Sequence, residues 1–254
     1  CMDRRRNVYF LSDLHLGARY FRSAHEAEKR AVAFLDHIKD DAAEIYLLGD
    51  VLDYWYEYRY VVPKGFVRFF GKLAELADDG VKITWIIGNH DIWIFDYLPS
   101  ELGIEVADGV LEKDILGKRF FLSHGDGVGR MPLPFRFMRA LFRNRFCQWL
   151  YSGIHPRWTI PFALGWSRSS RKRGAQDYAA EEGRKGAERL QSFAESHLAD
   201  FQRTDFYVFG HVHFQSRKLI GECSEVITLG GWISDFDYLK FDGNRLDLCK
   251  WRQE

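Results

Sequence analysis

Residues Phe10–Gly17 read FLSDLHLG and place an acid and an imidazole at the end of the first apolar run of the chain. The run at Val8–Ser12 is typical of a buried strand, and Asp13 and His15 follow it directly. One interpretation is a strand that ends in an aspartate turn. The other is one half of a metal site. The rest of the chain decides between them, because a metal site needs ligands from further segments.

The segments after this strand alternate between helical and extended patterns. Apolar residues at helical spacing predict helices over Ala24–Ile38 and Phe66–Ala77, and short apolar runs predict strands over Glu44–Leu48 and Val81–Ile87. This order indicates a parallel sheet with covering helices. A second, β-rich part is predicted from runs at Val110–Lys113, Lys118–Ser123, Asp205–Phe209, Glu225–Leu229, Tyr238–Phe241 and Arg245–Cys249.

The composition is that of a packed globular protein, with 46% hydrophobic and 16% aromatic residues, and we expect one domain over residues 1–254. The 36 basic and 36 acidic residues balance. The four cysteines are scattered without a CxxC pair, which favours a reducing compartment over a disulfide framework. No apolar run reaches the ~18 residues that cross a bilayer. Residues 2–7 lack the apolar core of a signal peptide.

One segment differs from the rest in its charge. Residues 127–176 carry ten Lys and Arg residues and no Asp or Glu, and they are rich in Phe, Trp and Leu. A linker would be poor in aromatic residues. We therefore expect a basic, aromatic helical lid, inserted in the domain over residues 127–197.

Side chains of the kinds that bind metals follow five of the predicted strands. They are Asp13 and His15; Asp50 and Asp53; Asn89, His90 and Asp91; His124 and Asp126; and His211 and His213. Sites in open α/β sheets form where the carboxyl ends of strands converge. Each motif alone is weak, but five of the nine histidines fall in this set. The sequence therefore predicts a metal site with two ions.

Carboxylate, imidazole and amide ligands suit Mn, Fe or Zn, and the absence of cysteine argues against a structural zinc site. Two divalent cations about 3.5–4 Å apart can share one carboxylate, clamp a phosphate ester and generate hydroxide from water. Asp50 is the predicted bridge because it ends a central strand. Asp53 and Asp91 either orient ligand residues or cap helix N-termini.

The motifs D-x-H, GD-x-x-D, GNHD, SHGD and GH-x-H, in this order, resemble those of calcineurin-like metallophosphoesterases over Phe10–His213. The resemblance implies an α/β fold, a four-layer α/β/β/α sandwich with two mixed sheets. It implies one metal held by Asp13, His15, Asp50 and His213, and a second held by Asp50, Asn89, His124 and His211. His90 would face the substrate phosphate, as a general acid or as a stabiliser of developing charge. Asp50 and His90 are thus the expected catalytic residues.

Within this superfamily, protein phosphatases carry GD-x-x-D-R-G and GNHE, whereas this chain has GDVLDYW and GNHD. The stretches LLGDVLDYWYEYR, LSHGDGVG and TLGGW instead resemble UDP-2,3-diacylglucosamine diphosphatases. That resemblance implies hydrolysis of a pyrophosphate bond in lipid A synthesis, with release of UMP and an acylated sugar phosphate. The chain departs from the pattern at His90, where the enterobacterial form has Arg, and at Gly127, where Thr is common.

The inserted segment has three interpretations. Its apolar residues recur at three and four, as in Phe135, Met138, Phe142, Phe146, Trp149 and Leu150, while Arg136, Arg139 and Arg143 lie on another face. Such a helix can bind a membrane surface, line an acyl-chain groove with arginines for the diphosphate, or simply pack on the core. Arg168, Ser170 and Arg171 are predicted substrate contacts, with a solvated loop as the alternative.

We therefore expect a dinuclear metal-dependent hydrolase of UDP-2,3-diacylglucosamine, with Mn²⁺ as the expected ion and Fe or Zn as alternatives. It would bind peripherally to the anionic cytoplasmic face of a bacterial inner membrane, with no nucleic acid and no obligate protein partner. One rival is a soluble phosphodiesterase or phosphatase acting on nucleotides or other phosphate esters. A second is a non-catalytic metal-site scaffold, which is disfavoured because no ligand position is replaced.

Overall fold

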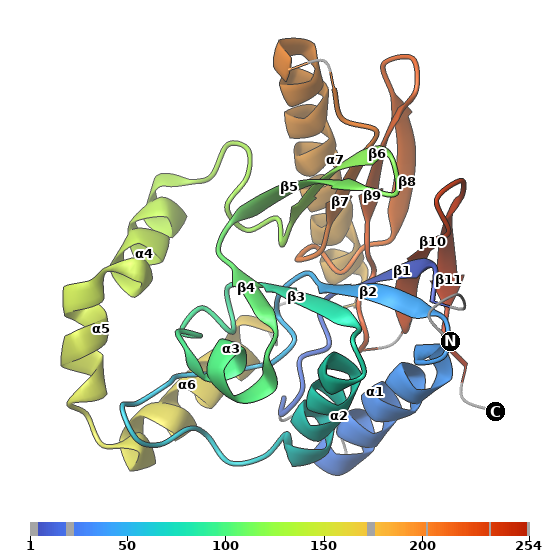
Figure 1. Cartoon of the computed structure of the whole chain (residues 1–254). Helices are drawn as coiled ribbons and strands as arrows, with labels where there is room; N and C mark the ends of the chain where they lie inside the picture. Colours follow the sequence, from blue (N-terminus) through green and yellow to red (C-terminus); the bar gives the residue numbers. More distant parts are fainter. Residues whose placement is uncertain (1–4, 19–22, 172–175, 202, 234, 253–254) are drawn as a thin grey trace.

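The computed structural model describes residues 5–18, 23–171, 176–201, 203–233 and 235–252. Two mixed sheets form its centre (Figure 1). The six-stranded sheet has the order β11-β10-β1-β2-β3-β4, with bounds β1 Asn7–Leu11, β2 Ala42–Leu47, β3 Lys82–Ile86, β4 Glu105–Ala107, β10 Asp237–Phe241 and β11 Leu246–Lys250. The five-stranded sheet has the order β5-β6-β7-β9-β8, with bounds β5 Val110–Ile115, β6 Lys118–Ser123, β7 Phe206–Phe209, β8 Ser216–Ile220 and β9 Ser224–Thr228.

Three apolar clusters join four layers. The first cluster packs α1 (Ala24–Ile38) and α2 (Val67–Asp78) on the outer face of the six-stranded sheet. The second fills the space between the sheets, where Phe10 stacks on Phe120 with ring centroids 5.3 Å apart. The third packs α7 (Gln176–Phe201) on the five-stranded sheet. The expected α/β/β/α sandwich of two mixed sheets is confirmed.

The expected strands and helices before residue 90 are present, and their bounds differ from the prediction by at most two residues. Three elements were not predicted. Strand β4 has three residues and α3 (Tyr97–Leu102) has six, too few to show a period. Strand β8 reads SRKLI and lies at the edge of its sheet, where exposed polar side chains conceal a strand.

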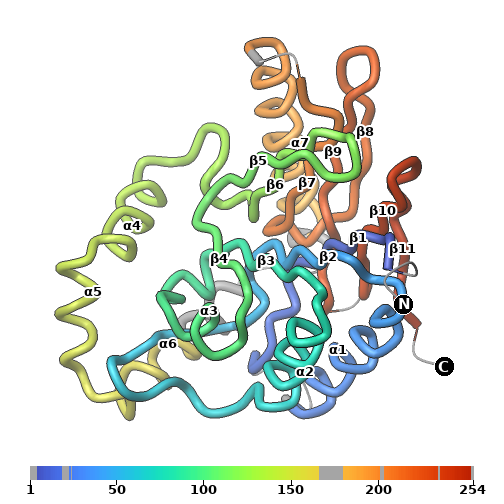
Figure 2. The backbone as a smooth tube through the Cα atoms, in the orientation of Figure 1, coloured from blue at the N-terminus to red at the C-terminus, as the bar shows by residue number. Residues whose placement is uncertain are grey.

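The inserted segment divides into two parts. Helices α4 (Leu133–Arg143), α5 (Arg145–Ser152) and α6 (Pro156–Arg171) run outside the layers along one side of the molecule, and we call these three helices the lid. The chain then returns through α7 to β7 (Figure 2). In α7, Leu190 and Ala194 are buried against the five-stranded sheet. The last third of the predicted 127–197 insertion, which lies in α7, is therefore a layer of the core, since its apolar face covers the sheet.

Candidate dinuclear metal centre

Five loops bring the predicted ligand residues to one edge of the sandwich. Strands β1, β2 and β3 run parallel in one sheet, and β6 and β7 run parallel in the other. The carboxyl ends of each set therefore lie at one edge, and the two edges meet. The residues that converge there are Asp13, His15, Asp50, Asn89, His90, His124, His211 and His213.

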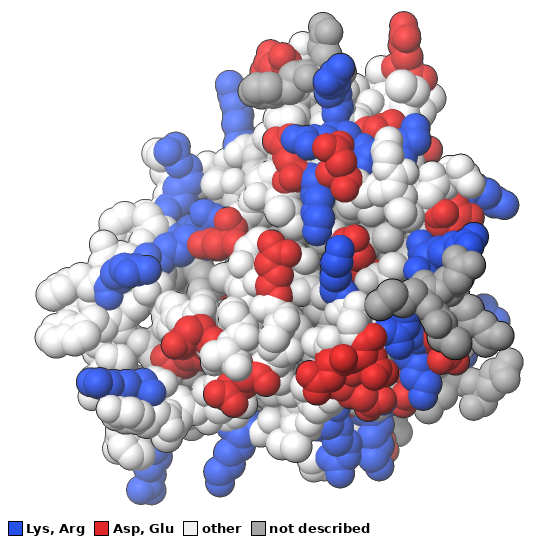
Figure 3. Space-filling view, in the orientation of Figure 1, with Lys and Arg blue, Asp and Glu red and all other residues white. Residues whose placement is uncertain are grey.

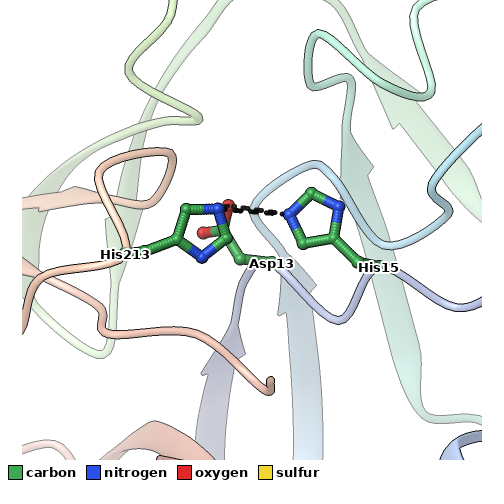
Figure 4. Close-up of side chains that lie close together, drawn as sticks. All are labelled: Asp13, His15 and His213. Atoms are coloured by element: carbon green, nitrogen blue, oxygen red, sulfur yellow. Dashed lines mark hydrogen bonds and ion pairs between the residues drawn. The ribbon is translucent and has the colours of Figure 1, made fainter. Parts of the chain in front are cut away.

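The first group of donor atoms comes from Asp13, His15 and His213 (Figure 4). The Nε2 atoms of the two histidines lie 3.2 Å apart. Asp13 Oδ1 lies 3.7 Å from Nε2 of His15 and 3.5 Å from Nε2 of His213. Asp50 Oδ2 is 3.8 Å from His15 Nε2, so it adds a fourth donor to this group.

The second group comes from Asp50, His124 and His211, whose ligand atoms lie within 4.8 Å of one another. His124 Nε2 is 3.3 Å from Asp50 Oδ2 and 3.2 Å from Asn89 Oδ1. His124 Nδ1 lies 2.8 Å from the Leu48 carbonyl oxygen, which can only accept, so Nδ1 carries the hydrogen. The lone pair of Nε2 therefore faces Asp50 and Asn89, which is the arrangement of a metal ligand.

These residues fit divalent cations. Asp13, His15, Asp50 and His124 are all buried, and Asp13 Oδ1 has no hydrogen-bond partner among the residues that the structure describes. A buried carboxylate oxygen without a partner is costly unless a cation satisfies it. Several acceptor atoms also point at one another in each group, and a positive ion between them would remove that repulsion. Asp50 belongs to both groups, as the predicted bridge requires.

The backbone at this edge is unusual. Asp13, His15, Asp50, His211 and His213 all have positive φ, between 44° and 69°. Few residues other than glycine adopt this conformation, and such outliers cluster at functional sites. Gly49, before Asp50, is also left-handed, and a Cβ there would lie 2.7 Å from both Gly88 Cα and His124 Nδ1. The loops therefore approach so closely that only a glycine fits between them.

Asp53 and Asp91 orient the loops and the ligand side chains, and neither caps a helix. Asp53 Oδ1 lies 3.3 Å from His15 Nδ1, which leaves Nε2 of that ring toward the first group. Asp91 accepts hydrogen bonds from the backbone N–H groups of Gly88 and Val51 and from the Trp85 indole, so it ties β3 to the loop that carries Asp50. Burial, with Asp50 nearby, raises the pKa of Asp91 to about 6.

The ligand side chains influence one another's charge. Burial raises the pKa of Asp50, but His124, His90 and His15 lower it more, and the pKa lies well below its usual value. The pKa of His124 rises for the reciprocal reason, since Asp50 outweighs burial. Burial and the neighbouring His124 lower the pKa of His211 to about 4, so His211 is neutral at neutral pH. A cation bound among these groups would favour the neutral form of His124 as well, because neutral imidazole is the form that binds a metal.

His90 lies beside both groups. Its backbone N–H donates to Asp50 Oδ1 over 2.8 Å, and its Nδ1 lies 3.0 Å from the Asp53 carbonyl oxygen. The hydrogen is therefore on Nδ1, and Nε2 is turned toward the site, 3.9 Å from Asp50 Oδ2. This atom can face a phosphate group bound at the site.

Two supporting features were not predicted from the sequence. The TLGGW stretch lies behind the first group: the Trp232 N–H donates to the Asp13 carbonyl, and a Cβ on Gly231 would lie 3.1 Å from His213 Nδ1. Arg139 donates from α4 to Asp126 over 2.9 Å, just after His124. Asp126 lies 13 residues before Arg139 and on a different element, so their pairing leaves no periodic signal in the sequence.

The prediction that Arg136, Arg139 and Arg143 share a separate charged face of α4 is corrected. Arg139 and Arg143 bind Asp126 and Asp108 on the body of the protein, while Arg136 is exposed. Phe142 packs on Trp93, with ring centroids 5.5 Å apart. The body-facing side of the helix therefore holds both arginines and apolar residues.

The lid carries many exposed large apolar side chains, and we call the surface that they form the outer side of the lid. Its exposed large apolar side chains are Leu133, Phe137, Leu141, Phe146, Trp149, Leu150, Ile154, Trp158 and Phe162. The predicted substrate contacts Arg168, Ser170 and Arg171 belong to α6, but their side chains lie outside the described residues. Within the described ranges, no helix is both long and apolar enough to pass through a membrane.

Sequence similarity to known proteins agrees with the geometry. Residues 6–215 match the model of the calcineurin-like phosphoesterases. A UDP-2,3-diacylglucosamine hydrolase from Porphyromonas gingivalis is 41% identical over 258 residues, which cover 96% of this chain and 97% of that protein. One from Shewanella piezotolerans is 22% identical over 95% of this chain and 96% of its own length. A solved dimetal phosphatase from Danio rerio covers 98% of this chain and 96% of its own, with 15% identity and a TM-score of 0.46. The chain therefore belongs to the calcineurin-like phosphoesterase family and is a metal-dependent phosphoester hydrolase.

Proposed function

We propose that the chain hydrolyses the pyrophosphate bond of UDP-2,3-diacylglucosamine and releases UMP and 2,3-diacylglucosamine 1-phosphate. The observation that carries this proposal is the near full-length similarity to the Porphyromonas gingivalis hydrolase, because the aligned region takes in both the metal-site loops and the lid. The convergence of buried carboxylates and imidazoles at one edge of the sandwich supports the same reaction.

We assign the ligands of two ions from the two donor groups. The first ion would be held by Asp13, His15, Asp50 and His213, and the second by Asp50, Asn89, His124 and His211. Mn²⁺ is the ion that we propose, and Fe or Zn also suits this mixture of oxygen and nitrogen ligands. When bound, the ions would polarise the phosphoryl oxygens and lower the pKa of a water molecule.

His90 and Asp50 are the proposed catalytic residues. Asp50 Oδ2 lies near His15 in one group and near His124 in the other, so its carboxylate would hold the two halves of the site at a fixed separation. His90 Nδ1 is occupied by the Asp53 carbonyl, which sets the ring so that Nε2 faces the site. When protonated, Nε2 would donate to a phosphate oxygen, either to stabilise developing charge or to protonate the leaving group.

The lid would hold the rest of the substrate. Tyr54 and Tyr56 follow the GDVLD motif, and their hydroxyl groups reach α5: the first lies 3.1 Å from the Tyr151 hydroxyl, and the second donates to the Gln148 carbonyl over 2.6 Å. The lid thus has a defined position relative to the metal loops. We propose that its apolar residues take the acyl chains and that Arg168, Ser170 and Arg171 contact the diphosphate.

We also propose that the enzyme binds peripherally to the inner face of the bacterial inner membrane, through the outer side of the lid. The exposed apolar side chains would enter the interface, and exposed arginines such as Arg136, Arg145 and Arg157 would face anionic head groups. Each basic residue near an anionic surface contributes about 1 kcal/mol. Along the outer left-hand edge of Figure 3, over α4 and α5, basic side chains lie in an otherwise uncharged surface.

The decisive experiment is product analysis with the purified protein, Mn²⁺ and UDP-2,3-diacylglucosamine. Release of UMP is expected, with faster turnover than for cyclic or linear nucleotide diesters. Faster turnover of the simple diesters would instead favour a soluble phosphodiesterase. The absence of hydrolysis with every phosphate ester would favour a metal-site scaffold without catalysis.

A further inference from the structure

The loop between β2 and α2, together with the first residue of α2, has an exposed apolar tip. Tyr60, Val61 and Val67 have relative exposures of 83%, 54% and 76%. Basic residues accompany them: the guanidinium of Arg59 lies 5.1 Å above the Tyr60 ring, and Lys64 follows in the same loop. Residues 58–74 contain no Asp or Glu. Like the insertion, this segment therefore combines exposed apolar residues with basic residues and contains no acidic ones.

The fold holds these side chains outward. Pro63 is buried, and Phe66 packs on the core residues Trp55 and Phe70, with ring centroids 6.2 and 5.9 Å away. Phe66 has a φ of 62°, and this left-handed turn leaves its neighbour Val67 on the outside. The exposure at the tip is therefore imposed by anchored residues on the same loop.

The tip adjoins the lid. The Tyr58 hydroxyl lies 2.5 Å from Thr159 Oγ1 in α6, and Trp158 and Phe162 of that helix are exposed. Figure 1 draws the loop running beside α6. The apolar side chains of the tip and those of α6 are therefore parts of neighbouring surfaces, although about 100 residues of chain separate Tyr58 from Thr159.

We propose that residues 59–67 form a second membrane-docking element, which binds an anionic phospholipid bilayer together with the outer side of the lid. The inference rests on the proposed function, since it extends the docking surface of that same enzyme. Exposed aromatic and aliphatic side chains beside Lys and Arg are the chemistry of an interfacial anchor. The absence of acids in residues 58–74 removes a source of repulsion from anionic lipid.

Two anchors would fix the orientation of the enzyme, whereas one would leave it free to pivot. The Tyr58–Thr159 contact joins the two elements, with α6 of the lid on one side of it and the loop on the other. Contact at both would hold α6 along the bilayer surface. A lipid substrate would then enter the lid directly from the bilayer.

The test is flotation of the full chain with vesicles, without substrate. Vesicles of phosphatidylcholine alone are compared with vesicles that also contain phosphatidylglycerol. The loop variant is Tyr60→Ser/Val61→Ser, and the lid variant is Phe137→Ser/Trp149→Ser. Leu219→Ser on β8 is the matched control, because Leu219 has a relative exposure of 60% and belongs to the five-stranded sheet, outside the lid.

We expect the loop variant to partition about tenfold more weakly into anionic vesicles, because two apolar side chains are lost from the interface. The control should bind like the original chain. Arg59→Gln/Lys64→Gln should weaken binding to anionic vesicles by about fivefold for each charge, with little change on phosphatidylcholine alone.

Three results would overturn the proposal. One is full vesicle binding by the loop variant while the lid variant fails to bind. Another is an equal loss of binding by the Leu219→Ser control. A third is a dimer in sedimentation velocity that only the loop variant abolishes, since a second copy would then cover the tip. Failure of the proposed function is recognised separately, by the absence of UMP release from the soluble enzyme.

Discussion

The left-handed glycine before Asp50, the proposed bridging aspartate, offers a sharp test of the proposed metal centre. Gly49 has a φ of 80°, and a Cβ there would lie 2.7 Å from Gly88 Cα and His124 Nδ1, where ordinary contact begins at 3.4 Å. Gly49→Ala must therefore displace these atoms by about 0.7 Å. Because Gly88 contributes backbone, no side-chain rotation can relieve the clash. The displacement reaches the loops of Asp50, Asn89 and His124 together.

The expected loss of unfolding free energy in Gly49→Ala is the sum of two costs. A left-handed alanine costs roughly 1–2 kcal/mol, and overpacking costs roughly 1–3 kcal/mol. Their sum, about 2–5 kcal/mol, lies below the 5–15 kcal/mol of a typical domain, so the variant should fold. Misplacement of reacting groups by about 1 Å can cost about 10²-fold in rate. We therefore expect a fall of that order in kcat/KM, equivalent to about 2.7 kcal/mol of activation free energy.

Gly80→Ala is the matched control. Gly80 has a φ of 86°, almost that of Gly49, but a Cβ there would meet nothing within 4 Å. The control should lose about 1 kcal/mol of unfolding free energy in urea and keep its activity. The assays are kcat/KM on a small chromogenic phosphodiester with Mn²⁺ and bound metal by mass spectrometry. If both variants lost activity equally, or if Gly49→Ala kept its activity and its metal, the steric reasoning would be wrong.

Three further predictions concern the site, the core and the lid. Asp50→Ala should abolish turnover and lower the bound metal while the circular dichroism spectrum stays unchanged, because only a shared ligand is lost; normal metal content would remove the bridging role. Leu190→Ala should lower the unfolding free energy in urea by about 2–5 kcal/mol, since Leu190 is fully buried against the five-stranded sheet; a change below 1 kcal/mol would contradict the placement of α7 in the core. Arg139→Gln removes the ion pair to Asp126 that joins α4 to the loop after β6. It should raise KM for the acylated nucleotide sugar more than for a small diester, and equal effects on both would refute a role in placing the lid.

The convergence of the proposed ligand residues could be predicted from the sequence, because each one follows an apolar strand closely. Asp13, Asp50 and His124 follow β1, β2 and β6 within three residues, and parallel strands bring such positions to one edge. The turn conformations could not be predicted in the same way. Positive φ at Asp13 and Asp50 arises from contacts between loops that are distant in the chain.

The sequence was less informative about the insertion, because α4 has apolar residues on both sides. Phe135 and Phe142 fit the expected stripe and are half-buried, but Leu133 and Phe137 point into solvent with the same three- and four-residue spacing. Helical period alone cannot tell which stripe meets the body of the protein. The arginines decide it, since Arg139 and Arg143 are held by Asp126 and Asp108 on the body.

The short segments that carry the proposed metal ligands also contact the lid. These contacts link the proposed phosphate-binding site to the proposed acyl-chain site. Tyr54 and Tyr56 come directly after Asp53, and both reach α5. Trp93 comes two residues after Asp91, and its indole donates to the Phe142 carbonyl over 2.9 Å. A change in the position of either loop would therefore move the lid as well as the ligands. In the proposed function, a substrate with its phosphates at the metals and its acyl chains in the lid needs a fixed distance between the two, and these aromatic residues would set that distance.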